Sequence, residues 1–187
     1  MPRICDTVER WGATDAEIGD SWPCDEWVLE PDQVLFRALT IDAPPAVVFR
    51  WLCQMRVAPY SYDWIDNLGR RSPRRLTPGL EDLAVGQRFM IFTLVSFEPD
   101  HHITLLLTDH PLFGAVALTY RVEPAPRGTR LAVKLRVRYP SPPLGWLMRA
   151  VLPAGDLVMM RKQLHTIAAL ATGESSGAVV APVPSAR

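Results

Sequence analysis

The ten residues from 130 to 139 read RLAVKLRVRY and decide the fold of this chain. Every second side chain in this segment is apolar or aromatic, namely Leu131, Val133, Leu135, Val137 and Tyr139. The positions between them are basic, apart from one alanine. A period of two predicts a β-strand with one buried face and one solvent-exposed, cationic face.

A sheet with one apolar face needs a second layer to cover it. Residues 156–171 supply that layer, because their apolar side chains recur at the period of an α-helix. The stripe consists of Met160, Leu164, Ile167 and Ala171. We therefore expect a C-terminal helix packed against the inward row of residues 130–139.

The rest of the chain predicts more strands and two short helices. Strand character appears in Val34–Ile41, Gln87–Phe92, Thr93–Glu98, His102–Asp109 and Ala115–Glu123. A helix begins at the prolines Pro44 and Pro45, with one apolar stripe, and ends before Pro59. Ser61 or Asp63 caps a second short helix that ends at Leu68. Consecutive strands with short connections are typical of an antiparallel sheet. The predicted class is α+β, a helix-grip fold in which a curved antiparallel sheet wraps around a long C-terminal helix.

The sequence divides into three parts. Residues 1–33 form an acidic N-terminal extension, in which residues 1–32 carry nine acids and only two arginines. The net charge of the whole chain is zero, so the remainder is basic, and we expect the extension to dock on it. Thr14 and Glu17 have capping-box spacing for a short helix between Trp11 and Gly19. The helix-grip domain covers 34–171, and 172–187 is expected to be a disordered tail.

Composition excludes several functional classes. A balanced charge argues against nucleic acid as a partner. Three cysteines without a C-x-x-C pair predict neither a disulfide framework nor a zinc site. No signal peptide is apparent, and the apolar stretch 144–160 is interrupted by Arg149, Pro153 and Asp156, so no membrane span is expected. These features predict a soluble, cytoplasmic protein whose oligomeric state the sequence leaves open.

The element order and several segments resemble the START-like superfamily, also called SRPBCC or the birch-pollen-allergen fold, and within it proteins of the polyketide cyclase/dehydrase type. The segments are RWGAT (10–14), FRALTIDAPP (36–45), WLCQM (51–55), YSYDWIDNL (60–68) and DLVMMRKQL (156–164). The resemblance implies a deep apolar cavity between the sheet and the last helix, with the two early helices at its mouth. Relatives hold lipids, sterols, quinones or polyketides there; some catalyse ring closure or dehydration, and others only carry.

The expected ligand is therefore an apolar small molecule. Its predicted binding residues are Tyr60, Tyr62, Trp64, Phe89, Ile91, Leu105, Leu118, Tyr120, Leu135, Met160 and Leu164. A second hypothesis is a metal-independent cyclase or dehydratase that uses Tyr60, Tyr62 and Asp63 for proton transfer. A third is a protein-interaction module that uses the basic face of residues 130–138 or the surface around Trp146.

Three other patterns carry less weight. The G-x-S-x-G at 173–177 lacks the strand and helix of a nucleophile elbow. A strand over 102–109 separates His101 and His102 from Asp109 and His110 by about 25 Å, so we expect no metal and no cofactor. Arg70, Arg71, Arg74 and Arg75 form either an anion site or a solvated loop.

Overall fold

The computed structural model describes residues 8–62 and 71–178. In chain order its elements are β1 (Arg10–Trp11), α2 (Asp15–Gly19), the 3₁₀ helix η1 (Pro23–Glu26), β2 (Gln33–Ile41), α3 (Pro45–Cys53), the 3₁₀ helix η2 (Gln54–Arg56), β3 (Arg88–Phe89), β4 (Phe92–Glu98), β5 (His102–His110), β6 (Gly114–Pro124), β7 (Thr129–Arg138) and α5 (Leu144–Ala178). The predicted helix ending at Leu68 lies outside the described residues.

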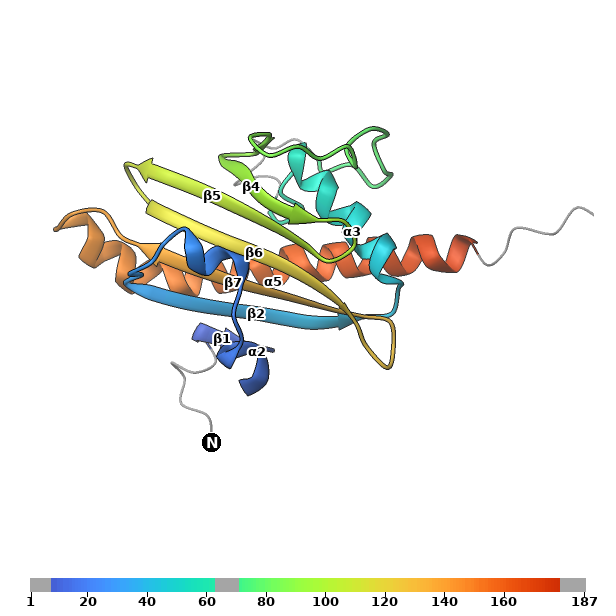
Figure 1. Ribbon diagram of the computed structural model, residues 1–187, viewed down its shortest axis with the longest axis horizontal. Coiled ribbons are helices and arrows are strands. Elements are labelled where there is room, and N and C mark those ends of the chain that lie inside the picture. Colours follow the sequence, from blue (N-terminus) through green and yellow to red (C-terminus); the bar gives the residue numbers. More distant parts are fainter. Residues whose placement is uncertain (1–7, 63–70, 179–187) are drawn as a thin grey trace, which may run out of the picture.

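The sheet is curved and has the strand order β1-β2-β7-β6-β5-β4-β3. All neighbouring strands are antiparallel except β1 and β2. Helix α5 crosses one face of this sheet, and α3 lies beside it (Figure 1). The α+β helix-grip fold is therefore confirmed.

Strand β7 has the two faces that its sequence predicts. Its inward row belongs to the main apolar core, which also contains Met160, Leu164 and Ile167 of α5. Val133 and Leu131 are fully buried there. The apolar side chains that alternate along residues 130–139 therefore pack against the C-terminal helix.

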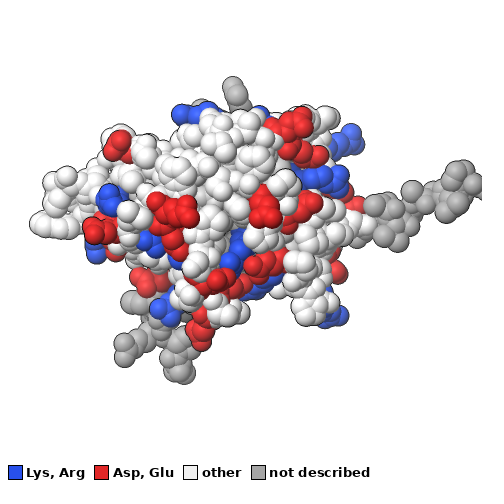
Figure 2. All heavy atoms as spheres, viewed as in Figure 1, with Lys and Arg blue, Asp and Glu red and all other residues white. Residues whose placement is uncertain are grey.

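The outer face of β7 is not solvent-exposed as predicted, because the N-terminal extension covers it. Arg130 forms an ion pair with Glu17 at 2.7 Å. Asp25 forms ion pairs with Lys134 at 2.7 Å and with Arg136 at 3.0 Å. A second apolar cluster, which contains Trp22, Cys24, Val28, Phe36, Ala38, Ala117 and Ala132, lies under these ion pairs. Figure 2 shows acidic and basic side chains close to one another on this face. The basic strand face proposed for a protein partner is thus occupied by this chain's own extension.

Local sequence signals position the extension. The Thr14 hydroxyl accepts the backbone N–H of Glu17, and the Glu17 carboxylate accepts the backbone N–H of Thr14 at 2.7 Å, which completes the predicted capping box. At Gly12, φ is +74° and a Cβ atom would lie 2.0 Å from the carbonyl oxygen of Ala38. Only glycine permits this approach of β1 to β2.

Helix α5 is longer than the predicted 156–171. It begins at Leu144 and continues through Pro153 to Ala178, so the residues from 172 to 178 are helical rather than part of a disordered tail. Glu174 accepts hydrogen bonds from Arg50 and from the Trp51 indole of α3. The C-terminal end of α5 is therefore held against α3. The G-x-S-x-G motif lies within this helix.

The predicted strand over 87–92 is interrupted. Strand β3 ends at Phe89, and Met90, with φ of +55°, begins a tight turn into β4 at Phe92. Ile91 lies in that turn and is 43% exposed.

Across the part of the chain that the structure describes, no helix has the length and apolar character of a membrane span.

Candidate functional site

An apolar cavity, here called the inner cavity, lies between the sheet and α5. It has a volume of about 260 Å³. Strands β5, β6 and β7 contribute Leu105, Leu118 and Leu135, and the turn after β3 closes one side. From α5 come Met159 and Met160. Its remaining lining residues are Met55, Pro59, Ser61, Phe89, Met90, Ile91, Phe92, Tyr120, Asp156 and Gln163.

A second apolar hollow, here called the side pocket, adjoins the inner cavity and has a volume of about 430 Å³. The two share Ile91, Phe92, Leu135, Asp156 and Met159 in their linings. The first turns of α5 and the β5–β6 connection supply its outer wall, with Leu112, Phe113, Met148, Val151 and Leu152. Apolar space therefore extends along the underside of α5.

One hydrogen-bonded chain crosses the wall of the inner cavity. The Tyr120 hydroxyl donates to Gln163 Oε1 at 2.7 Å, and Gln163 Nε2 donates to the Pro59 carbonyl at 2.6 Å. These two hydrogen bonds connect β6 and α5 to the segment after α3. Burial raises the pKa of Tyr120 well above its ordinary value, so its phenol stays neutral and serves as a donor.

Asp156 is the only side chain with a full charge among the described residues that line either space. Its Oδ2 lies 2.7 Å from Nη2 of Arg37, a fully buried side chain of β2. Burial raises the pKa of Asp156 to about 6, although Arg37 pulls it down. Burial also lowers the pKa of Arg37. Desolvation therefore outweighs the attraction within this pair.

Arg37 is held by several backbone carbonyls besides Asp156. Its Nη1 donates to Phe36 at 2.7 Å and to Glu9 at 3.1 Å, and its Nη2 donates to Pro153 at 3.3 Å. The guanidinium thus connects the extension, β2 and the proline-containing turn of α5. It also fixes Asp156 at the junction of the inner cavity and the side pocket.

Seven of the predicted ligand-binding residues line the inner cavity: Phe89, Ile91, Leu105, Leu118, Tyr120, Leu135 and Met160. Leu164 does not, because it is fully buried in the core behind that wall. Tyr60 lines a different hollow, here called the basic pocket, together with Arg74, Lys162 and His165. Its ring packs edge-on against Trp51, with centroids 6.0 Å apart.

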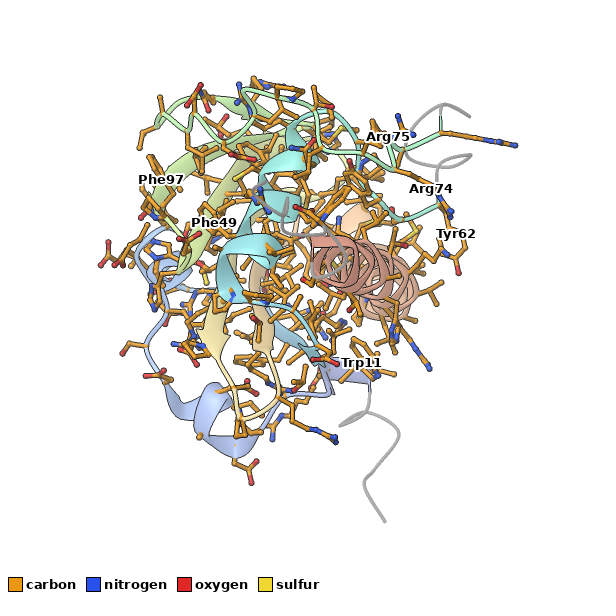
Figure 3. All side chains as sticks on the ribbon, turned by 90° about the vertical axis from the view of Figure 1, so that its right-hand side faces the viewer. Trp11, Phe49, Tyr62, Arg74, Arg75 and Phe97 are labelled. Carbon is orange, nitrogen blue, oxygen red and sulfur yellow. The ribbon has the colours of Figure 1, made fainter. Side chains whose placement is uncertain are left out.

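Tyr62 lies on the outer side of α5, beside Val158 and Arg161. Figure 3 shows it on the side of that helix away from the sheet. Asp63 and Trp64 lie outside the described residues. The structure therefore does not bring Tyr60 and Tyr62 together in the inner cavity.

Sequence reasoning missed Asp156 and Arg37 as site residues. In the sequence, Asp156 is a break in an apolar stretch and the start of a helix and of a family segment, and Arg37 is part of another family segment; neither stands out as a site residue. An arginine at an inward position of a strand, in FRAL (36–39), was the available signal, because such a charge needs a buried partner. The partner itself, 119 residues away, could not be found without the fold.

The histidines are arranged differently from the expectation. Strand β5 does separate His102 from His110, as predicted. Strict alternation would point His101 and His102 to opposite faces, but their rings pack edge to face with centroids 5.5 Å apart. His101 precedes the strand and follows Asp100, whose φ of +60° turns the chain. The alternation rule applies only within a strand.

The chain belongs to the polyketide cyclase/dehydrase and lipid transport family, which matches residues 36–172. Among solved structures, it is similar to a protein from Chromobacterium violaceum, with 17% identity, a TM-score of 0.50, and coverage of 74% of this chain and 96% of the other. It is also similar to a Mesorhizobium loti protein, with 20% identity, a TM-score of 0.45 and coverage of 74% and 96%.

A third similar structure is the di-domain ARO/CYC StfQ of the steffimycin biosynthetic pathway, with 11% identity and a TM-score of 0.47. The match covers 76% of this chain and 51% of StfQ, about half of that protein. None of the curated protein sequences compared with the chain matches it significantly.

Proposed function

We propose that this protein binds an apolar small molecule of the lipid, quinone or polyketide type in the inner cavity. The observation that carries the proposal is an apolar space of about 260 Å³ between the sheet and α5, bordered by a side pocket of similar character. Such concave apolar sites with few polar groups are typical of small-molecule binding. Membership of a lipid transport and cyclase family supports the same role.

The methionines of the lining suit a ligand of irregular shape. Met55, Met90, Met159 and Met160 all contribute to the inner cavity. Methionine is unbranched and polarisable, so it adapts its conformation to a bound molecule. The few polar side chains of the lining, Ser61, Tyr120, Asp156 and Gln163, would orient a ligand that carries an oxygen function.

The test is a titration with N-phenyl-1-naphthylamine, a neutral fluorescent probe. Wild-type protein is expected to bind it with increased emission. Leu135→Trp should weaken binding by at least about tenfold, because Leu135 lines both apolar spaces and the larger ring fills them. Val158→Trp, on the exposed side of α5, is the matched control and should bind as wild type does.

Thermal unfolding establishes that both variants fold. If folded Leu135→Trp binds the probe as tightly as wild type, or wild type does not bind it, the proposal is wrong.

One observation favours a second candidate, a cyclase or dehydratase acting in the same cavity. Asp156 faces apolar space, and burial raises its pKa to about 6, close to the value that suits a general base at neutral pH. This assigns proton transfer to Asp156 rather than to the predicted Tyr60, Tyr62 and Asp63.

Exchange of the α-protons of 2-tetralone in D₂O tests the second candidate. Catalysed exchange by wild type that Asp156→Asn loses, with unchanged binding of N-phenyl-1-naphthylamine, would support it. Equal exchange by the two proteins would exclude it.

A further inference from the structure

The hairpin between β4 and β5 brings three metal-binding side chains together. Glu98 ends β4, His102 begins β5, and the two are direct partners in the antiparallel register. Directly opposed residues have Cβ atoms only about 5 Å apart and lie on the same face. His101 joins them because the left-handed Asp100 turns the chain just before it.

Three atoms of this cluster converge. His101 Nδ1 lies 3.2 Å from Glu98 Oε2, His102 Nδ1 lies 3.8 Å from the same oxygen, and the two Nδ1 atoms are 3.3 Å apart. The circle through the three atoms has a radius of about 2.0 Å, which is the metal–ligand distance of zinc with histidine and carboxylate. An ion just above their plane would lie at bonding distance from all three atoms.

We propose that Glu98, His101 and His102 form a binding site for a divalent transition-metal ion, of which Zn²⁺ is the best match. Two imidazole nitrogens and one carboxylate oxygen suit Zn²⁺, Cu²⁺ or Ni²⁺ better than Mg²⁺ or Ca²⁺, which prefer oxygen ligands. Glu98 is 65% exposed at its side chain and His101 47%, so solvent can complete the coordination.

The surroundings of His102 favour this role. Its side chain is only 11% exposed, and its Nε2 lies 3.1 Å from Ser96 Oγ. When Nε2–H donates to Ser96, the lone pair of Nδ1 points toward Glu98 and His101. Such hydrogen bonds commonly orient the ring of a metal-binding histidine. Ser96 is therefore a positioning residue.

This site is separate from the inner cavity. Phe92 lines the cavity at the start of β4, and Glu98 is six residues further along, about 20 Å at the usual rise of a strand. Metal binding and ligand binding can therefore be tested independently. The prediction from sequence of no metal rests on the strand that separates His101 and His102 from Asp109 and His110, and that set leaves out Glu98.

The experiment is an equilibrium titration of untagged full-length protein with ZnCl₂. Binding is monitored by isothermal titration calorimetry and by NMR of the histidine ring nitrogens. One ion should bind per chain, with shifts at Nδ1 of His101 and His102 but not at His110 or His165. His102→Ala and Glu98→Gln should each weaken binding by more than about tenfold, and Ser96→Ala by about 10–100-fold. His110→Ala is the matched control and should bind zinc as wild type does.

Thermal unfolding without zinc checks that each variant folds. The proposal would be overturned by an absence of stoichiometric binding to wild type, or by undiminished binding to folded His102→Ala and Glu98→Gln. Zinc binding that only His110→Ala removes would also overturn it, because the ion would then occupy a different site.

Discussion

Replacing Arg37 by leucine should reveal the buried ion pair that places Asp156 beside the cavity. Arg37 is fully buried and pairs with Asp156, whose side chain is 13% exposed. Arg37→Leu leaves the carboxyl without its cation and removes the guanidinium hydrogen bonds to the carbonyls of Phe36 and Pro153. Removing one partner of a buried pair destabilises proteins by about 3–5 kcal/mol, so we expect a loss of that order at pH 7.

The raised pKa of Asp156 determines how the stability of the fold changes with pH. Burial already raises the pKa of Asp156 to about 6, above roughly 3.9 in the unfolded chain. The folded protein therefore holds this proton more tightly, and the contribution of Asp156 to stability is greatest below about pH 4 and falls as pH rises through 6. Without Arg37 the pKa rises further, and keeping the carboxyl protonated costs about 4 kcal/mol at pH 7 and about 1.5 kcal/mol at pH 5. Wild type already bears about 3 and about 1.5 kcal/mol at these two pH values, so the loss caused by the substitution should be about 1 kcal/mol smaller at pH 5.

Urea unfolding at pH 7 and pH 5 measures both effects. The double variant Arg37→Leu, Asp156→Leu removes both charges and should recover most of the lost stability. Arg50→Leu is the matched control, because its ion pair with Glu174 is partly exposed and should contribute at most about 1 kcal/mol. Equal stability of the single and double variants, or a loss from Arg37→Leu that does not shrink at pH 5, would refute this reasoning.

Two further changes test other parts of the structure. Thr14→Ala should lower the free energy of unfolding by about 1 kcal/mol, since it removes the cap of α2, while Thr14→Ser should retain it; equal urea midpoints for the two would contradict the role of the capping box. Burial raises the pKa of the Cys24 thiol to about 11 and that of Cys53 to about 12, so iodoacetamide at pH 8 should alkylate neither in the native protein and both in urea, as peptide mass mapping will show. Rapid native alkylation of either would contradict their burial.

Much of the fold was predictable because its signals are local. The alternation of residues 130–139, the helical stripe from Met160 to Ala171 and the capping box of Thr14 each depend on a few neighbouring side chains. The length of α5 was less predictable, because Pro153 usually ends a helix. Its extension to Ala178 relies on Glu174 contacting Arg50 and Trp51, which sequence spacing does not reveal.

The candidate site was predictable only where the period of a strand determines which side chains point inward. Inward strand positions such as Leu118 and Leu135 could be assigned to the cavity from the period of two. The pairing of Arg37 with Asp156, and of Glu98 with His102, depends on strand register and on the path of α5. Tyr62 was assigned to the site as an aromatic residue near the second helix expected at the cavity mouth, and the structure places it on the outer side of α5.

The most direct test of ligand binding is NMR of protein labelled with ¹³C at its methionine methyl groups. Of the six methionines, Met55, Met90, Met159 and Met160 line the inner cavity and Met148 lines the side pocket. Saturating N-phenyl-1-naphthylamine should shift the four inner methyl signals and give nuclear Overhauser effects between them and the probe, with assignments from single Met→Leu variants. Binding that leaves all four signals unmoved, or no binding at all, would contradict the proposal that this cavity holds the ligand.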